Sequence, residues 1–460
     1  MYYNRGKLDT LSAENEILTC KKCRIDHSNR SKKEKTMKSY KELSPAERRA
    51  LYEELSLLYG EYVKKGLTLD LSRGKPNGSQ LDASNGLLTV DLAKSYSSRA
   101  GVDCRNYGIV DGLPEMKEFF AKAMGLNKDD IIIGGNSSLQ LMYDTLSRAM
   151  IFGVHGSKQP WAQEKGLKWI CVAPGYDRHF KITELLGFEL LTVKMLPTGP
   201  DMDEVERLAL DPKVKGIWCV PKYSNPTGCT YSDDTVRRLA AMKCGAPDFR
   251  IMWDNAYGIH DFTEDKDELA DIFALAREYG NEDRIFYYSS TSKVTYPGGG
   301  VAFMATGANN RKQIAPYLAA QTIGYDKINQ LRHLRFFGTP EKMLSHMLQL
   351  GGVIKAKFDV ALDKLSELDG LGIAEWTEPK GGYFISVDVM KGTAKRVYEL
   401  TSKAGVTLTP VGATFPYGVD PDDTNLRLAP TYPTDVELAL ACEILVLSIK
   451  LAALEKLGLK

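Results

Sequence analysis

The sequence has few cysteines, almost no net charge and no long apolar run, and each shortage excludes a class of protein. Eight cysteines among 460 residues are too few and too scattered for the disulfide framework of a small secreted domain. A formal net charge of +1 creates no field over the whole molecule that would collect nucleic acid or an anionic membrane. We therefore expect a small, locally recognised partner, with no nucleic acid and no membrane involved.

Targeting segments are also missing from the sequence. No apolar stretch approaches the ~20 residues that a spanning helix requires, and the N-terminus lacks the apolar core of a secretory signal. We therefore expect a cytoplasmic protein. A composition of 43% hydrophobic and 26% charged residues over 460 positions is typical of a globular protein with two or three domains of about 100 to 200 residues each.

The first 36 residues differ in composition from the rest. They hold nine basic and five acidic residues and little that is apolar, which predicts a disordered extension. Cys20 and Cys23 could supply half of a zinc site, but a structural zinc needs four ligands and no second pair has a suitable spacing. Since a capped helix is predicted to start soon after Met37, we hypothesise that Met37 is a natural start.

Residues 84–335 alternate short apolar runs with helical patterns. Several runs are apolar without alternation, as in a parallel sheet covered by helices on both faces, so we predict a large α/β domain here. Long helical patterns at 340–365 and 435–457, with a short strand at 383–387, are expected to join residues 37–83 in a smaller α+β domain, comprising 37–83 and 336–460. The predicted strands of the large domain are 131–133, 169–173, 190–193, 216–220, 250–253, 284–288 and 301–305.

A lysine follows one of these strands at once. Ser290 and Lys293 come directly after 284–288, and glycines 298–300 allow close approach of the backbone. An amine in this place could form a Schiff base, with neighbouring hydroxyls and amides holding a phosphate. Taken alone, the motif is also typical of a surface loop.

Other strand ends carry polar or aromatic residues too. Asp254 and Tyr257 follow 250–253, Asn225 follows 216–220, and Tyr176 follows 169–173. Individually these residues could be caps, turn residues or packed aromatics. Because parallel strands present their carboxyl ends at one edge, where α/β proteins bind ligands, we expect them to share a rim. Residues Asn136, Ser137 and Ser138 precede a helical pattern, and free amides at a helix start favour phosphate.

Five motifs in this order and spacing resemble the class I aminotransferases of fold type I, over residues 40 to 460. A narrower resemblance, carried by residues 71–76 and 107–114 and by the Lys293-Val-Thr-Tyr-Pro-Gly-Gly-Gly stretch, is to the type Ic aspartate aminotransferases. The five motifs are Asn225-Pro-Thr-Gly228, Asp254-x-x-Tyr257, Ser290-x-x-Lys293, Gly381-Gly-Tyr-Phe384 and Asn425-Leu-Arg427-Leu.

The resemblance implies a mostly parallel sheet sandwiched by helices, pyridoxal 5'-phosphate as the cofactor, and a role for each motif residue. Lys293 would hold the cofactor and move the substrate proton. Asp254 would pair with the pyridine nitrogen, Tyr257 and Asn225 would bind the phenolic oxygen, and Tyr176 would stack on the ring.

The resemblance also implies phosphate and substrate ligands. Ser290 and the turn 136–138 would hold the phosphate, and Tyr107 would reach it from the neighbouring subunit of a homodimer. Arg427 would bind the substrate α-carboxylate through its planar fork. Gly74 would let the N-terminal segment close over the substrate, and Phe384 would wall the pocket.

One departure concerns the phosphate, because residues 298–302 lack the arginine that many class I enzymes carry shortly after the lysine. The expected reaction converts L-aspartate and 2-oxoglutarate to oxaloacetate and L-glutamate by a ping-pong cycle through pyridoxamine phosphate. Other amino donors (aromatic amino acids, or alanine with glyoxylate) and a lyase reaction on the same cofactor remain open. A transcription regulator would need a DNA-binding domain in front, and the 36-residue extension shows no helix-turn-helix pattern.

A dicarboxylic substrate also requires a cation for its distal carboxylate. The sequence offers five candidates that it cannot rank, namely Arg73, Lys75, Arg178, Arg332 and Arg335.

Overall fold

The structure, a computed structural model, describes residues 38–459. The expected basic extension 1–36, the Cys20 and Cys23 pair and the hypothetical start at Met37 lie outside this range. None of the helices in residues 38–459 is long and apolar enough to cross a membrane.

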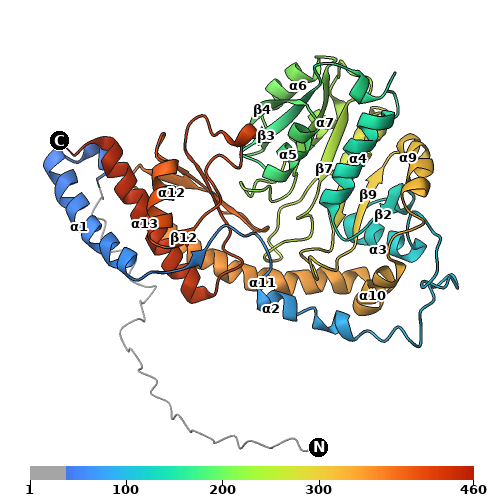
Figure 1. Cartoon of the computed structure of the whole chain (residues 1–460), viewed down its shortest axis with the longest axis horizontal. Coiled ribbons are helices and arrows are strands. Elements are labelled where there is room, and N and C mark those ends of the chain that lie inside the picture. Colours follow the sequence, from blue (N-terminus) through green and yellow to red (C-terminus); the bar gives the residue numbers. More distant parts are fainter. Residues whose placement is uncertain (1–37, 460) are drawn as a thin grey trace, which may run out of the picture.

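An eight-stranded sheet forms the centre of the larger part of the molecule (Figure 1). Strands β8, β7, β6, β3 and β4 run parallel to one another, whereas β9 and β5 are antiparallel to their neighbours. The predicted α/β class with a mostly parallel sheet is therefore confirmed. In spatial order the strands are β2 (Ile131–Ile133), β9 (Ala302–Thr306), β8 (Ile285–Ser290), β7 (Arg250–Asp254), β6 (Val214–Cys219), β3 (Lys168–Ala173), β4 (Glu189–Leu196) and β5 (Gly199–Pro200).

Helices cover both faces of this sheet, and its strands are therefore apolar on both sides. In β6, for example, Ile217 and Cys219 pack into one core while Trp218 packs into the other. The face that includes Trp218 is covered by α4 (Ser138–Phe152), α5 (Asp177–Leu185) and α9 (Ala308–Gln321). The face that includes Ile217 and Cys219 is covered by α3 (Pro114–Met124), α6 (Met202–Ala209), α7 (Asp233–Ala241), α8 (Ile272–Glu278), α10 (Lys327–Phe337) and the start of α11 (Pro340–Leu365).

The remaining elements share a third core. Helix α11 links this core to the sheet, since Met347 packs under the sheet and Phe358, three turns later, packs in the third core; Figure 1 shows the helix running beneath both parts. The elements of the third core are α1 (Pro45–Lys64), α12 (Ala394–Lys403), α13 (Asp435–Leu457), the pair β1 (Leu69–Asp70) and β12 (Val406–Thr407), and the antiparallel sheet β10 (Ala374–Trp376), β11 (Ile385–Val389) and β13 (Asn425–Leu428). The predicted division of the chain at residue 335 stays a prediction.

Local sequence signals explain most of the element boundaries. Helix α1 is the capped helix expected soon after Met37. It begins with a capping box, in which the Ser44 hydroxyl accepts from the backbone N–H of Glu47 and the Glu47 carboxylate accepts from that of Ser44. Helices α11 and α13 have the predicted bounds. The predicted strand 383–387 begins two residues late, as β11, because Gly382 has φ +83° and the chain is still turning there.

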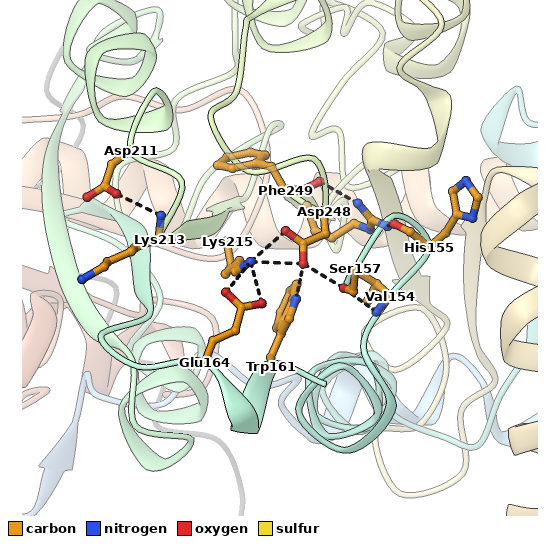
Figure 2. Close-up of polar contacts among 11 residues, drawn as sticks. Val154, His155, Ser157, Trp161, Glu164, Asp211, Lys213, Lys215, Asp248 and Phe249 are labelled. Carbon is orange, nitrogen blue, oxygen red and sulfur yellow. Dashed lines mark hydrogen bonds and ion pairs between the residues drawn. The ribbon is translucent and has the colours of Figure 1, made fainter. Parts of the chain in front are cut away.

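A buried ion-pair cluster closes the edge of the sheet where β6 and β7 begin (Figure 2). Lys215 is 4% exposed, and its Nζ lies 2.9 Å from Asp248 Oδ1 and 2.9 Å from Glu164 Oε2. Asp248 Oδ2 also accepts from Trp161 Nε1 at 2.7 Å and from Ser157 Oγ at 2.8 Å. Every oxygen of Asp248 is thus bound, which is the condition for keeping a charge in the interior.

The pKa of Asp248 reflects this environment. Burial favours the neutral acid, but the donors from Lys215, Ser157 and Trp161 together outweigh burial, so the pKa lies below its usual value. A carboxyl with a lowered pKa in the folded state stabilises the fold above its unfolded pKa, and that contribution is lost as the pH falls through the folded value.

Replacing Lys215 with methionine should destabilise the protein by about 3 to 5 kcal/mol, because the Asp248 charge would stay buried without its cation. Urea unfolding at pH 7 measures the loss. The matched control is Lys64→Met in the exposed pair with Glu61, which should cost less than about 1 kcal/mol. The gap in unfolding free energy between Lys215→Met and wild type should narrow as the pH falls through the lowered pKa of Asp248, because the carboxyl is then neutral in the folded protein. Equal losses in Lys215→Met and Lys64→Met would contradict this reading.

Candidate active site

The predicted site residues meet at the opposite edge of the sheet, where the parallel strands end. They line a cavity of about 400 Å³. The structure brings together in its wall all of the predicted residues except Asn136 and Tyr107. Those in the wall are Gly74, Ser137, Ser138, Tyr176, Asn225, Asp254, Tyr257, Ser290, Lys293, Phe384 and Arg427.

Asp254, the last residue of β7, is a buried carboxylate with one free oxygen. Its Oδ2 lies 3.0 Å from His179 Nε2, while its Oδ1 is buried in the cavity wall with no partner among the described residues. A carboxylate accepts hydrogen bonds, so a proton on His179 Nε2 is the one that satisfies this contact. A buried acceptor without a hydrogen bond costs free energy. A ligand with a donor at this oxygen would remove that cost.

His179 is a residue of the site that was not predicted from the sequence. It lies 1% exposed on α5, stacks on Trp218 with ring centroids 4.4 Å apart, and meets Tyr176 edge-on at 4.9 Å. Its ring is therefore fixed from three sides, and it fixes Asp254 in turn. A signal was present, because His179 follows Tyr176 by three residues, one turn along a helix that starts at the rim.

The amine of Lys293 lies near two aromatic rings. Its Nζ is 5.0 Å from the ring centroid of Tyr257 and 5.9 Å from that of Tyr383. Burial, with a smaller effect of Asp254, raises the pKa of Tyr257 above its usual value, so its phenol stays a proton donor. His260 packs edge-on against Tyr257, and burial together with nearby cations lowers its pKa to about 3, so it stays neutral.

Arg427 reaches the cavity from β13 in the smaller part of the molecule. Its Nη1 donates to Asp177 Oδ1 at 3.1 Å and to Asn225 Oδ1 at 3.3 Å, and its Nε donates to Thr409 Oγ1 at 3.3 Å. The guanidinium also lies 5.1 Å from the ring centroid of Phe384. These contacts hold the planar fork with its remaining N–H groups available for a carboxylate.

Gly74 and Phe384 are in direct contact at the cavity. A Cβ added to Gly74 would lie 2.1 Å from Cζ of the Phe384 ring. Only glycine therefore fits here without moving the ring, and this close approach brings the segment after β1 onto the cavity.

Hydroxyls and backbone amides gather at the end of the cavity near α4. Ser137 is the N-cap of α4 and makes no side-chain capping bond, which leaves the first amides of the helix without a side-chain acceptor. Ser290 Oγ donates to Ser292 Oγ at 3.0 Å, and Ser292 Oγ donates to the Asn136 carbonyl at 2.9 Å. This end has donors suited to a phosphate.

The two predicted residues outside the wall differ in position. Asn136 is exposed, and its side chain donates to the Pro297 carbonyl at 3.2 Å. Tyr107 is 79% exposed on the segment between β1 and α3. Neither residue contributes a side chain to the cavity of this single chain.

Comparisons with known proteins agree with this geometry. The family model described as aspartate amino-transferase matches residues 43–460. An aspartate aminotransferase of Corynebacterium glutamicum is 44% identical over 412 residues, which cover 89% of this chain and 95% of that protein. A crystal structure of an aspartate transaminase from the same species has a TM-score of 0.90 at 42% identity, covering 91% of this chain and 99% of that one.

A more distant solved structure shows the same fold. The aspartate aminotransferase from Thermus thermophilus with maleate has a TM-score of 0.63 at 18% identity, covering 87% of this chain and 98% of that one. Fold and cavity together define an aminotransferase of the fold type I class, which uses pyridoxal phosphate. Within that class, this chain belongs to the aspartate aminotransferase family.

The residues of the cavity fit pyridoxal phosphate. The free Oδ1 of Asp254 is an acceptor for a protonated ring nitrogen, and an anion would meet the hydroxyls and amides at the α4 end. Lys293 supplies an amine in the same cavity. Residues 294–302 contain no arginine, and the cations lining the cavity are Lys293, Arg178 and Arg427. At the α4 end, serine hydroxyls and helix amides are the phosphate ligands that the cavity offers.

Substituting His179 tests whether it positions Asp254. His179→Phe keeps the stacking on Trp218 but removes the hydrogen bond, and we expect kcat to fall by about 10- to 100-fold, as for partners that orient a functional group elsewhere. His179→Gln, whose amide nitrogen can replace Nε2, should recover much of the loss. Steady-state kinetics of both holoenzymes gives the comparison, and equal activities would remove His179 from the site.

Proposed function

We propose that this protein transfers the amino group of L-aspartate to 2-oxoglutarate, giving oxaloacetate and L-glutamate. The observation that carries the proposal is a single cavity that joins an amine, a buried carboxylate with one free oxygen and a guanidinium, from Lys293, Asp254 and Arg427. The family and the relatives named aspartate aminotransferase support the choice of substrate. Pyridoxal phosphate, when bound, supplies the electron sink that stabilises negative charge at the substrate Cα.

The substrate would be oriented by its α-carboxylate. Arg427 can grip it with the N–H groups that Asp177 and Asn225 leave available, while Phe384 supports the guanidinium face. A carboxylate held in such a charged pair is stabilised against leaving as carbon dioxide. The same contact therefore favours proton removal over decarboxylation.

Lys293 would move the proton at Cα. Its Nζ lies beside the phenol of Tyr257, and both line the cavity with Asn225. Because Tyr257 stays protonated, it and Asn225 can donate to an anionic oxygen. Asp254, fixed by His179, would keep a ring nitrogen protonated. In this proposal the amine of Lys293 both removes and returns the proton at the substrate Cα.

A homodimer in the cytoplasm is part of this proposal. Tyr107 carries the argument for the dimer, because it is 79% exposed and does not line the cavity of its own chain. Its aromatic side chain could complete the phosphate end of a neighbour's site. A partner nucleic acid or membrane is not expected. Amino acids and 2-oxo acids are the substrates of the family.

Absorption spectra test the reaction. Adding L-aspartate alone to the holoenzyme should replace the visible band of the bound cofactor with a near-ultraviolet band, and 2-oxoglutarate should restore it. Lys293→Ala should abolish turnover, since no other amine lines the cavity among the described residues. A spectrum that ignores aspartate but responds to alanine or phenylalanine would overturn the substrate assignment.

Arg427→Lys tests the carboxylate contact. A lysine keeps the charge but loses the two-pronged geometry, so KM should rise for every amino donor and kcat/KM should fall by about 10- to 100-fold. Steady-state kinetics with aspartate and with alanine measures the effect. An unchanged KM for both substrates would place the α-carboxylate elsewhere.

A further inference from the structure

The turn that carries Lys293 is tied to helix α10 by a buried histidine. His333 lies on α10 and is 0% exposed. Its Nε2 lies 3.3 Å from Thr291 Oγ1 and 3.1 Å from Thr295 Oγ1. Because Thr291 precedes Lys293 and Thr295 follows it in the same turn, one imidazole ring contacts both sides of the turn.

The neighbours of His333 define which ring nitrogen carries the proton. Its Nδ1 lies 2.9 Å from the Asn329 carbonyl oxygen, and because a carbonyl only accepts, the proton is on Nδ1. Burial lowers the pKa of His333 to about 4, so the ring is neutral in neutral solution and Nε2 is an acceptor. The Thr291 hydroxyl oxygen accepts from the Val301 N–H at 2.9 Å, which leaves its own proton for Nε2.

Other contacts hold the same segment by its backbone. Asn329 Nδ2 donates to the carbonyls of Gly299 at 2.9 Å and Gly300 at 3.0 Å, and His346 Nε2 lies 3.1 Å from the Val294 carbonyl. Any donor of the right length could make these contacts. The position of His333 is more demanding, since it calls for a buried acceptor, which lysine and arginine do not provide and a carboxylate provides only as a charge.

The amine of Lys293 has weaker contacts than the turn from which it extends. Its Nζ lies 5.0 Å from the ring centroid of Tyr257 and 5.9 Å from that of Tyr383. Contacts of a cation with a ring face are favourable over a range of positions, whereas hydrogen bonds are directional. The place of the amine in the cavity therefore depends on the turn.

We propose that His333 is a positioning residue for Lys293, which holds the turn so that the amine lies at the substrate Cα. This inference rests on the proposed function, in which Lys293 moves that proton, and deepens it. A displacement of about 1 Å at a reacting group can lower the rate by about 100-fold. The two threonine hydroxyls and the ring prevent such a displacement from outside the cavity.

Four variants separate positioning from stability. His333→Asn keeps a donor near the Asn329 carbonyl but loses the acceptor, because its amide reaches only the place of Nδ1, whereas His333→Gln reaches the place of Nε2 with an amide oxygen. Thr295→Val removes one of the two hydroxyls. Its matched control is Thr401→Val, because Thr401 is buried on α12 and its hydroxyl, like that of Thr295, lies within hydrogen-bonding distance of the carbonyl four positions earlier.

Two readouts are compared. Steady-state kinetics of each holoenzyme gives kcat and kcat/KM for aspartate. Borohydride reduction of each holoenzyme without substrate, followed by mass spectrometry, gives the fraction of chains in which pyridoxal phosphate becomes fixed to Lys293.

His333→Asn should lower kcat and kcat/KM by the same factor, roughly 10- to 100-fold, because the lost contact acts on the reacting amine and leaves Arg427 unchanged. It should also lower the fraction of chains fixed at Lys293. His333→Gln should recover much of both losses. Thr295→Val should give a smaller loss in both readouts, and Thr401→Val should resemble wild type.

Two results would overturn the role of His333. Wild-type behaviour of His333→Asn in both readouts would do so, and so would equal losses in His333→Asn and His333→Gln, which would indicate general damage to the fold. If His333→Asn does not fold, Thr295→Val and Thr401→Val decide, and equal behaviour of these two contradicts the assignment. The borohydride readout needs no substrate, so a wild-type enzyme that does not use aspartate would refute the proposed function and leave the test of His333 intact.

Discussion

Two buried carboxylates lie at opposite ends of one strand, and they differ in how many of their oxygens have hydrogen-bond donors. Asp248 precedes β7 and has donors on both oxygens, from Lys215, Trp161 and Ser157. Asp254 ends β7 and has a donor on one oxygen only. Leaving a buried acceptor open costs free energy, which the surrounding fold must supply. A ligand with a donor at this point would satisfy the open oxygen, which lies in the wall of the cavity.

The cavity depends on both parts of the molecule. The sheet supplies the groups at its strand ends, whereas Arg427, Gly74 and Phe384 come from the elements of the third core. Helix α11 packs in both cores, and an isolated bridge between Asp261 and Gly381 joins the loop after β7 to the turn before β11. Because these links are continuous packing and backbone hydrogen bonds, the guanidinium is held in register with the sheet edge.

The sequence predicts the sheet and most of the cavity because a parallel sheet converts order along the chain into position in space. Each strand contributes the residues just beyond its carboxyl end, so Asn225, Asp254 and Lys293 could be assigned to one rim without a structure. The pairing of Asp177 with Arg427 could not, since 250 positions separate them and no local pattern encodes which side chains meet across two cores. The late start of β11 has a local cause, the left-handed turn at Gly382.

Burial also explains why the two arginines of the cavity differ. Arg427 has a side chain only 10% exposed, and a charge in that position needs a counter-charge before any substrate arrives, which Asp177 provides. Arg178 is exposed and stays hydrated without a partner. A substrate carboxylate at Arg427 would therefore share the guanidinium with Asp177, which is bound through Nη1.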